Sequence, residues 1–440
     1  MNISIIGSGY VGLTTGACFA ELGNKVICAD NNKKKIACLR NGSMPIYEPG
    51  LGELIARNAA NKRLQFSSQI KDAVRSSEII FITVGTPALE NGEADLTGIE
   101  NVARSIAVNL PAGKAGMKGY RLIVEKSTVP VETGDWVRRT IANYVKDKTK
   151  FDVASNPEFL REGQAINDFM HPDRIVIGAE SKKARDLLSQ LYKPFNVPIV
   201  VTNIKSAELI KHASNAFLAA KISFINAVSQ LCDKVGADVE EVARGMGLDK
   251  RIGPSFLRAG IGYGGSCFPK DLDAFVTIAE KLGYDFKLLR AVRRVNEEQM
   301  GFMLKKIKDS LWIIKGKTIG VLGLAFKPDT DDIRNSPAIG LIKMLQAEGA
   351  RIRAYDPQAM PKARLELSRV NFCAGAYAAA RSADCLLIAT EWDEFKELDF
   401  ARIRKLLKRP LIIDARNLYE PGHMEKSGFT YISVGRKRVC

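Results

Sequence analysis

The chain has 440 residues, enough for two or three domains with sizeable cores, and its hydrophobic content of 46% is typical of a globular protein. No segment approaches the roughly 18 consecutive apolar residues of a membrane span, so we do not expect a membrane protein. The formal net charge of +16 favours anionic small-molecule ligands. Nucleic acid is the weaker alternative, because the basic residues are dispersed and are not interleaved with aromatic ones.

Cysteine and histidine usage argues against disulfides and metals. None of the eight cysteines is in a CxxC motif, and most lie in apolar contexts, so we expect reduced thiols. Only three histidines are present, which leaves little material for a metal centre or a histidine-based triad. The N-terminal sequence MNISIIGSGYVGL lacks the basic region and cleavage site of a signal peptide. We therefore expect a cytoplasmic protein without a bound metal.

Strands alternate with helices through the first 200 residues. A helix near residues 11–22 follows the first strand. Apolar segments predict strands at residues 2–7, 25–30, 78–85, 121–127, 152–156 and 174–178. This alternation predicts a doubly wound parallel sheet.

The pattern changes at Ser206. No Gly or Pro interrupts residues 206–235, and Gly236 follows as a helix terminator, which predicts one helix of about 45 Å. Such a helix suits a spine between domains or a dimer interface. Alternation resumes at Lys317, with a helix near 337–348 and strands in 317–325, 351–357, 383–390 and 410–416. We predict two Rossmann-like doubly wound α/β domains, at 1–200 and 301–440, joined by an α-helical middle domain at 201–300.

A dinucleotide-binding fingerprint opens the chain. The segment Gly7–Gly12 reads GSGYVG, follows the first strand and starts the first helix, and Asp30 closes the second strand. The glycines allow a tight turn near a pyrophosphate, and the helix N-terminus offers N–H groups to it. Asp30 can accept from a ribose hydroxyl and would repel a 2′-phosphate, so NAD is favoured over NADP. Lys33–Lys35 weaken that preference, and a glycine turn without a ligand is the alternative.

Polar residues gather where strands of the predicted sheets end, as ligand sites do in parallel α/β proteins. Lys211 and Asn215 lie one turn apart in the predicted long helix, where solvated surface positions are the alternative. The other candidates are Ser127-Thr128, Asn156-Pro157-Glu158, Glu162, Lys327 and Arg334.

The segment Gly262–Asp271, GYGGSCFPKD, raises four alternatives for Cys267: a core thiol, a redox sensor, half of a metal site, or a nucleophile. The glycines before it leave room for a ligand. Lys270 and a helix start would favour the thiolate, and Asp271 would lie one turn beyond the thiol if a helix begins here. These features favour the nucleophile, with the inert thiol next.

The motifs along the chain together resemble the UDP-glucose/GDP-mannose dehydrogenase family, nearly end to end and in matching order. They include GSGYVGL, MPIYEPGL, EKSTVP, NPEFLREGQAINDF, SAELIKHASNAFLAAKISFIN, GIGYGGSCFPKD and GLAFKPDTDDIRNSPA. The resemblance implies two successive NAD-dependent oxidations of UDP-glucose at C6, first to the aldehyde level and then to UDP-glucuronate. Cys267 would form a thiohemiacetal and then a thioester that water hydrolyses.

The resemblance also implies roles for individual residues. The implied catalytic residues are Cys267, Lys211, Asn215, Asp271, Thr128 and Glu158. The implied NAD-binding residues are Gly7, Gly9, Val11, Gly12, Asp30, Lys35, Thr86, Thr128, Glu162, Lys270 and Arg334. The implied substrate-binding residues are Phe159, Leu160, Arg161, Glu162, Lys211, Asn215, Arg251, Phe256, Leu257, Arg258, Ala259, Gly260, Gly264, Lys327 and Arg416.

Among these, Lys211 and Asn215 would stabilise oxyanions, and Arg251 would reach the substrate of a neighbouring subunit, which implies a homodimer joined through the long helix. Arg416 would be a substrate or interdomain contact. The chain departs from the family at Glu132, where glycine is usual, and in the longer, basic segment 111–120. The alternatives are a GDP-mannose or UDP-N-acetyl-sugar dehydrogenase, or a nucleotide-sensing or nucleic-acid-binding protein without catalysis.

Overall fold

The computed structural model describes residues 1–89, 91–110, 119–145 and 150–440, so most of the basic segment 111–120 lies outside the described residues. The chain folds into two compact units. The first comprises residues 1–214 with 273–282, and the second comprises residues 215–272 with 283–440. Helices α9 (Ile204–Val235) and α11 (Phe268–Lys281) contribute residues to both units. The division into domains at 1–200, 201–300 and 301–440 stays a prediction.

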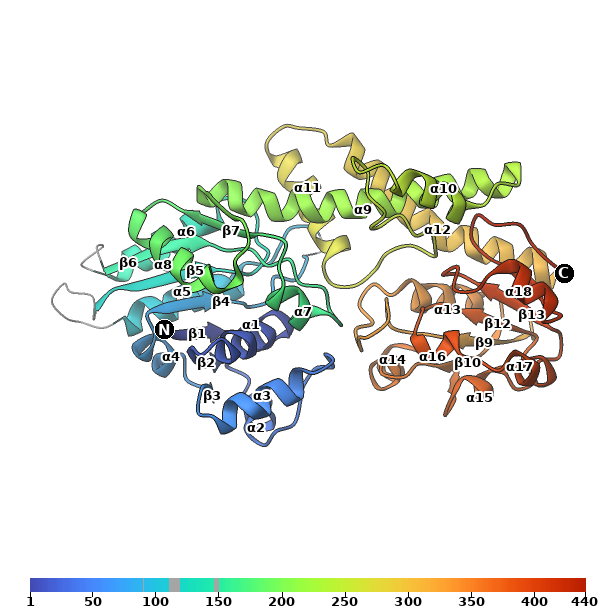
Figure 1. Ribbon diagram of the computed structural model, residues 1–440, viewed down its shortest axis with the longest axis horizontal. Coiled ribbons are helices and arrows are strands. Elements are labelled where there is room, and N and C mark those ends of the chain that lie inside the picture. Colours follow the sequence, from blue (N-terminus) through green and yellow to red (C-terminus); the bar gives the residue numbers. More distant parts are fainter. Residues whose placement is uncertain (90, 111–118, 146–149) are drawn as a thin grey trace. The chain divides into compact units, whose positions relative to one another are not determined.

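The first unit is built on an eight-stranded sheet in the order β3-β2-β1-β4-β5-β6-β7-β8 (Figure 1). The strands are β1 (Asn2–Ile6), β2 (Lys25–Ala29), β3 (Leu64–Ser67), β4 (Ile79–Ile82), β5 (Arg121–Glu125), β6 (Phe151–Ser155), β7 (Ile175–Ala179) and β8 (Ile199–Thr202). All neighbours are parallel except β6 and β7, which pair antiparallel. The predicted doubly wound α/β fold is confirmed, with this one antiparallel pair.

Helices of the first unit give this sheet a hydrophobic core on each face. They are α1 (Tyr10–Glu21), α2 (Lys33–Arg40), α3 (Leu51–Ala60), α4 (Ile70–Ser76), α5 (Thr97–Asn109), α6 (Thr133–Tyr144), α7 (Ala165–Met170), α8 (Lys182–Tyr192) and the short 3₁₀ helix η3 (Lys193–Phe195). Phe81 belongs to one core cluster, while its strand neighbours Ile80 and Ile82 belong to the other. Because successive strand residues point to opposite faces, a strand buried on both faces is a continuous apolar run.

The second unit contains a six-stranded, all-parallel sheet in the order β11-β10-β9-β12-β13-β14. Its strands are β9 (Thr318–Leu322), β10 (Arg351–Tyr355), β11 (Val370–Phe372), β12 (Cys385–Ile388), β13 (Leu411–Asp414) and β14 (Thr430–Ile432). Its further helices are α10 (Val239–Gly247), α12 (Lys287–Leu311), α13 (Pro337–Ala347), α14 (Met360–Glu366), α15 (Ala376–Ala380), α16 (Asp393–Lys396), α17 (Phe400–Leu406) and α18 (Pro421–Lys426). This confirms the second predicted α/β fold.

The predicted long helix is present as α9, a single helix of 32 residues. Asn203 caps its start, because its side-chain Oδ1 accepts from the backbone N–H of Ser206 at 2.7 Å. Gly236 has a φ of 76° directly after its last residue, a left-handed conformation that ends helices. Among the described helices, none is both long and apolar enough to cross a bilayer.

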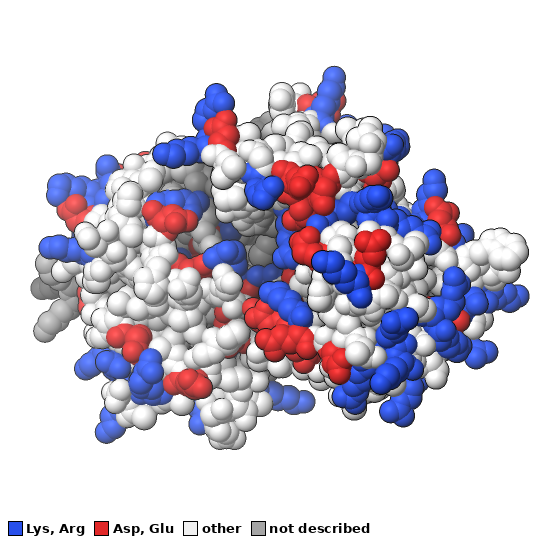
Figure 2. Space-filling view, turned by 45° about the vertical axis from the view of Figure 1, so that its right-hand side comes forward, with Lys and Arg blue, Asp and Glu red and all other residues white. Residues whose placement is uncertain are grey.

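The surface charge is mixed. On the face shown in Figure 2, Lys and Arg side chains lie among Asp and Glu side chains on both units. This mixture agrees with the dispersed basic residues of the sequence. It does not form the single-sign stripe expected of a nucleic-acid-binding face.

Candidate active site

The turn between β1 and α1 has the shape that a dinucleotide pyrophosphate requires. Gly7 has a φ of 108°, and a Cβ there would stand 2.7 Å from the carbonyl oxygen of Thr83. A Cβ on Gly12 would stand 1.9 Å from the carbonyl oxygen of Gly7, whereas one on Gly9 would meet nothing within 4 Å. No side chain caps the N-terminus of α1. The residues present therefore fit a bound pyrophosphate.

Asp30 lies beside this turn as a buried acceptor. Its carboxylate accepts from the backbone N–H groups of Ser8 at 2.8 Å and Asn32 at 2.9 Å, and from Lys35 Nζ at 3.0 Å. Burial alone would raise the pKa of Asp30, but these three donors outweigh it and lower the pKa. Asp30 is thus held as a carboxylate, as ribose binding needs. The ammonium of Lys35 is paired with it, which reduces what Lys35 could offer to a 2′-phosphate.

Three side chains hold the loop after β5, which carries Thr128. Thr86 Oγ1 donates to the backbone oxygen of Thr128 at 2.9 Å, and Ser127 Oγ donates to that of Val84 at 2.8 Å. From α9, His212 Nε2 donates to the backbone oxygen of Val129 at 2.7 Å. Thr128 is therefore held in a fixed place at the carboxyl end of β5.

A buried ion pair lies at the carboxyl end of β6. Lys211 Nζ, from α9, is 3.1 Å from Glu158 Oε1, and both side chains are 5% exposed. The other carboxylate oxygen of Glu158 accepts from the backbone N–H of Leu160 at 2.5 Å. The ring of Phe159 contacts two cations, with the Arg174 guanidinium 3.7 Å and Lys211 Nζ 5.3 Å from its centroid. Two other predicted residues lie here. Arg161 is exposed and its guanidinium makes two hydrogen bonds to the carboxylate of Asp168, and Glu162 is half-buried.

A helix begins at the segment around Cys267, which is the condition under which Asp271 was expected to lie one turn beyond the thiol. Cys267 directly precedes α11, and its backbone oxygen accepts from the N–H of Asp271 at 2.8 Å, so Asp271 does lie one turn beyond. The thiol is partly exposed, and its Sγ is 3.6 Å from Ser266 Oγ. Its position at a helix N-terminus favours the thiolate.

Asp271 is buried and bonded to two other predicted residues. Asn215 Nδ2 donates to Asp271 Oδ2 at 2.6 Å, and Lys270 Nζ donates to Asp271 Oδ1 at 2.6 Å. The α9 residues Lys211 and Asn215 thus each contact one carboxylate, Glu158 and Asp271 respectively. The predicted catalytic residues therefore form two polar clusters, one in each unit.

The predicted nucleotide-sugar loop, residues 256–264, is tightly packed within the second unit. The backbone N–H of Gly260 donates to Asn226 Oδ1 at 2.9 Å, and a Cβ on Gly264 would stand 2.2 Å from the carbonyl oxygen of Asn335. Phe256 has a φ of 65°, which is costly for a bulky residue and is typical of a functional loop. Leu257 and Ala259 are buried, whereas Arg258 is exposed.

Arg416 joins three backbone segments of the second unit. Its guanidinium donates to the carbonyl oxygens of Ala389 at 3.0 Å, Gly262 at 3.1 Å and Phe326 at 2.9 Å. These bonds use donors that a ligand would otherwise meet, and they hold the loop that precedes Cys267. The geometry is that of a residue that positions the loop.

Three predicted cationic residues lie near the surface. Arg251 is 89% exposed and pairs with Asp249 at 2.6 Å. Arg334 pairs with Asp332 at 2.6 Å, and Lys327 Nζ lies 5.8 Å from the centroid of the Phe326 ring. Their exposure leaves them accessible to anionic ligands, and their predicted contacts stay predictions.

The sequence does not single out several side chains that the structure places in this region. Lys126, Glu208, His212, Asn226 and Gln299 are all buried and hydrogen-bonded to the predicted segments or beside them. The weak signal for each is a polar residue inside an otherwise apolar element. Among the described residues, no group of three or more His, Cys, Asp or Glu side chains could hold a metal ion.

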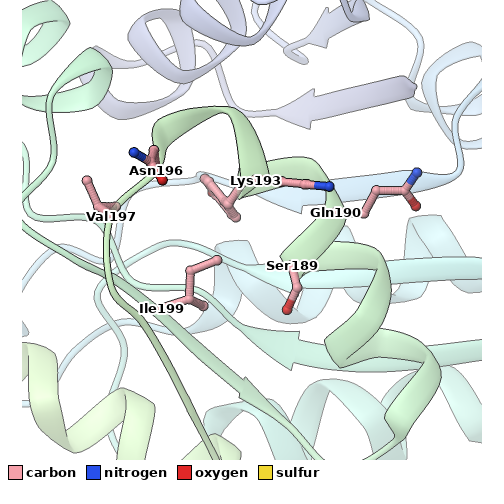
Figure 3. A pocket seen from close by; sticks show the side chains of 7 residues that line it. Ser189, Gln190, Lys193, Asn196, Val197 and Ile199 are labelled. Carbon is pink, nitrogen blue, oxygen red and sulfur yellow. The ribbon is translucent and has the colours of Figure 1, made fainter.

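One pocket of the first unit lies elsewhere and contains none of the predicted residues (Figure 3). It has a volume of about 650 Å³ and is formed by α8, η3 and β8. Its lining residues are Ser189, Gln190, Tyr192, Lys193, Asn196, Val197 and Ile199.

A Rossmann-type turn with an ionised acidic partner and a cysteine at a helix start are features of NAD-dependent dehydrogenases that oxidise beyond the aldehyde level. The chain belongs to the UDP-glucose/GDP-mannose dehydrogenase family. The family's NAD binding domain matches residues 1–196, its central domain residues 205–298 and its UDP binding domain residues 320–421. The predicted family, the NAD cofactor and a nucleotide-sugar substrate are thereby confirmed.

Individual relatives agree over the full length. The chain is 50% identical to UDP-glucose 6-dehydrogenase TuaD of Bacillus subtilis, over 100% of this chain and 94% of that protein. It is 48% identical to a UDP-glucose 6-dehydrogenase of Rhizobium meliloti, over 99% and 100%. The solved structure of a UDP-glucose dehydrogenase from Pyrobaculum islandicum is 40% identical, with a TM-score of 0.91 over 99% of this chain and 98% of that one.

Proposed function

We propose that this chain oxidises UDP-glucose at C6 to UDP-glucuronate, consuming two NAD and one water and releasing two NADH. The observation that carries the proposal is Cys267 at the start of α11, one turn before the buried carboxylate of Asp271. A simple alcohol dehydrogenase needs no such thiol. The full-length relatives bearing the name UDP-glucose 6-dehydrogenase support this choice of sugar.

The first oxidation converts the C6 alcohol to an aldehyde. NAD, when bound, accepts the hydride from C6. Glu158 accepts the hydroxyl proton through the water that it helps to orient, and Lys211, 3.1 Å from its carboxylate, donates to the developing oxyanion. The amide of Asn215, one turn further along α9, donates to the developing oxyanion.

The second oxidation depends on Cys267. The thiolate attacks the aldehyde carbon to form a thiohemiacetal, which can lose a hydride where the aldehyde cannot, and a thioester results. Water then attacks the thioester carbon, releasing the thiol and the carboxylate. Asp271, held by Asn215 and Lys270, accepts a proton from that water. Thr128 and Glu158 help to orient the water.

Cofactor and substrate contacts complete the proposal. NAD is held by the Gly7–Gly12 turn, Asp30 and Lys35, with Thr86, Thr128, Glu162, Lys270 and Arg334. The sugar nucleotide is held by residues 159–162, Lys211, Asn215, residues 256–260, Gly264 and Lys327, and Arg416 holds the loop that precedes Cys267. The chemistry of these residues fits both ligands: helix N-terminal N–H groups and cations for phosphates, and amides and carboxylates for sugar hydroxyls.

We propose a homodimer joined along α9. Phe217, Phe224 and Leu231 repeat every seven residues and are 67%, 54% and 59% exposed. A seven-residue repeat puts them on one face of the helix, and such an apolar stripe is typical of a helix-to-helix interface. Arg251 then acts on the substrate of the neighbouring subunit. A reducing compartment, the cytoplasm, suits the eight cysteines, all of which lie among the described residues and none of which forms a disulfide there.

The test is a stoichiometric assay of the purified chain with NAD and one of three sugars: UDP-glucose, UDP-N-acetylglucosamine or GDP-mannose. We expect two NADH per UDP-glucose and little turnover of the others. Efficient oxidation of another sugar with none of UDP-glucose contradicts the proposal, and one NADH per sugar contradicts the thioester route.

Cys267→Ser should reduce formation of UDP-glucuronate roughly a thousandfold, because the activated nucleophile is lost. The measurement is product formation followed by chromatography. Cys440→Ser, which changes an exposed thiol outside the site, is the matched control and should keep full activity. Full turnover by Cys267→Ser would rule out the nucleophile.

A further inference from the structure

The loop that leads into Cys267, residues 260–266, forms neither a helix nor a strand, yet side chains hold its first residue. The N–H of Gly260 donates to Asn226 Oδ1 at 2.9 Å, and its carbonyl oxygen accepts from Gln299 Nε2 at 2.8 Å. A buried backbone outside a helix or sheet must find such partners elsewhere. The start of the loop is therefore fixed to α9 and α12.

The far end of the loop is also held at both backbone groups of one residue. The N–H of Gly265 donates to the carbonyl oxygen of Arg334 at 2.9 Å, and its carbonyl oxygen accepts from Asn335 Nδ2 at 3.2 Å. Gly265 has a φ of 84°, and a Cβ there would stand 2.8 Å from the ring of Phe326. The packing of the loop itself therefore requires this glycine.

The middle of the loop is held by the half-buried amide of Asn296 on α12. Its Oδ1 accepts from the backbone N–H of Tyr263 at 2.8 Å, and its Nδ2 donates to the carbonyl oxygen of the same residue at 3.1 Å. The neighbouring Gly262, whose carbonyl oxygen Arg416 holds, has a φ of 109°, and a Cβ there would stand 2.8 Å from Asn296 Oδ1. Two bonds to one residue fix its orientation as well as its position.

Tyr263 extends this restraint to the residues beside the thiol. Its ring packs edge-on against the ring of Phe268, with the centroids 5.8 Å apart and the planes at 88°. Phe268 is the first residue of α11 and directly follows Cys267. The ring of Phe256 packs against Phe268 as well, at 6.1 Å. Because packed side chains transmit displacement, a shift of Tyr263 would move the first turn of α11.

We propose that Asn296 is a positioning residue for Cys267. By holding Tyr263 at both backbone groups, its amide sets the place from which the thiolate meets the aldehyde carbon, and it does not itself contact the substrate. Displacing a reacting group by about 1 Å costs about a hundredfold in rate, so such a support matters. The inference rests on the proposed function, because it takes Cys267 as the nucleophile of the second oxidation.

The test uses the C6 aldehyde of UDP-glucose as the substrate in two directions, measured as initial rates. Its oxidation with NAD and water to the carboxylate needs the thiol, whereas its reduction with NADH and a proton to the C6 alcohol does not. Asn296→Ala removes both bonds to Tyr263. At saturating substrate its kcat for oxidation should fall about a hundredfold, and its kcat for reduction should stay within about twofold of wild type. An equal fall in both directions, or no fall in oxidation, overturns the proposal.

Two further variants separate positioning from a general loss of stability. Asn58→Ala, in the first unit, also removes an amide that makes two hydrogen bonds, so it should lower the melting temperature and leave the ratio of the two rates unchanged. If Asn296→Ala does not fold, Asn296→Asp keeps the acceptor for the N–H of Tyr263 and loses the donor, so the ratio of oxidation to reduction should fall about tenfold. A wild-type ratio in Asn296→Asp, or a lowered ratio in Asn58→Ala, overturns the proposal.

Cys267→Ser distinguishes a failure of this inference from a failure of the proposed function. If Cys267→Ser oxidises the aldehyde as fast as wild type, the nucleophile assignment fails and the role of Asn296 fails with it. If Cys267→Ser loses the oxidation and Asn296→Ala keeps it, the proposed function stands and only the inference fails. If another nucleotide sugar is oxidised in place of UDP-glucose, its C6 aldehyde is used, and a lowered ratio supports the role of Asn296 although the proposed sugar is wrong.

Discussion

The three glycines of the β1–α1 turn have separate physical roles. Gly7 and Gly12 are required by the protein itself, because a Cβ on either would stand within 2.7 Å of a backbone oxygen. Gly9 is the N-cap residue directly before α1, with a φ of −87° and open space beside it. Its lack of a side chain therefore serves a ligand.

We expect Gly9→Ala to affect NAD binding and Gly7→Ala to affect the stability of the fold. We expect Gly9→Ala to keep the wild-type melting temperature and to raise the KM for NAD about tenfold, because its methyl group would meet the pyrophosphate. Gly7→Ala should destabilise the fold by about 1–3 kcal/mol, owing to its φ of 108° and its contact with Thr83. Thermal unfolding and NAD titration check both. Equal effects on stability would show that Gly9 is also structural.

The start of α6 is held by a side chain from α9. Glu208 accepts from the backbone N–H of Glu132 at 2.8 Å and that of Gly134 at 2.8 Å, so it caps α6 from a distant part of the sequence. Glu132 itself has a φ of 80°, a left-handed backbone conformation that favours glycine. Its exposed carboxylate pairs with Lys205 at 2.7 Å. This turn of α9 therefore fixes the loop that carries Thr128.

Glu208 should make this anchor depend on pH. Burial raises the pKa of Glu208 to about 7, against the lowering effect of the Gly134 and Glu132 N–H groups; Asp135 acts to raise it further and Lys205 to lower it. A carboxyl with a raised folded-state pKa binds its proton more tightly when folded. Its contribution to stability is thus full at low pH and falls as the pH rises from about 4.5 to 7, by up to about 3 kcal/mol.

Glu208→Gln is neutral at every pH and lacks this loss. The stability advantage of the wild-type chain over Glu208→Gln should therefore be larger at pH 5 than at pH 8. Melting temperatures of both proteins across this range provide the measurement. A difference that stays constant with pH would show that Glu208 does not titrate there.

The six strands of the second sheet follow the same order as the first six strands of the first sheet, but the acidic residue after the second strand has different partners in the two units. Asp356, at the end of β10, corresponds in position to Asp30 at the end of β2. It is fully buried and accepts from the N–H groups of Leu324, Ala325, Gln358 and Ala359 and from Trp392 Nε1. Its carboxylate oxygens are thus occupied by donors from three segments of the second unit. The first unit alone presents a ribose acceptor of the Asp30 kind.

Assembly of the whole molecule should depend on the α9 stripe. Phe217→Glu combined with Phe224→Glu should halve the mass measured by light scattering, because charge in an apolar interface is unfavourable and each Phe contributes about 1.5–3 kcal/mol when buried. Leu365→Glu, at a position 89% exposed on α14, is the matched control and should leave the mass unchanged. A double variant of wild-type mass would place the interface elsewhere.

Most of the fold could be predicted from the pattern of apolar residues. Buried parallel strands are short, continuous apolar segments, whereas in helices the apolar residues recur every three to four positions. The strands that the sequence did not indicate are β3, β8, β11 and β14, which are the edges of the two sheets. An edge strand is covered on fewer sides, so its pattern is weaker, as the half-exposed Val370–Phe372 shows.

Some residues of the candidate site could be predicted from the local sequence, and others could not. Gly7–Gly12, Asp30 and the Cys267–Asp271 helix start were readable, because each depends on residues a few positions apart and on local sterics. Resemblance supplied the roles of Lys211, Asn215 and Glu158.

By itself, then, the sequence determined the two α/β folds, the single helix α9, the dinucleotide turn and a cysteine at a helix start. Tertiary structure alone decided which buried polar groups meet: Lys126 with Asn156, Glu208 with the start of α6, and Arg416 with three separate loops. These partners are 27 to 154 residues apart in the chain. The order of the strands in each sheet brings these partners together, and the local pattern of apolar residues does not reveal that order.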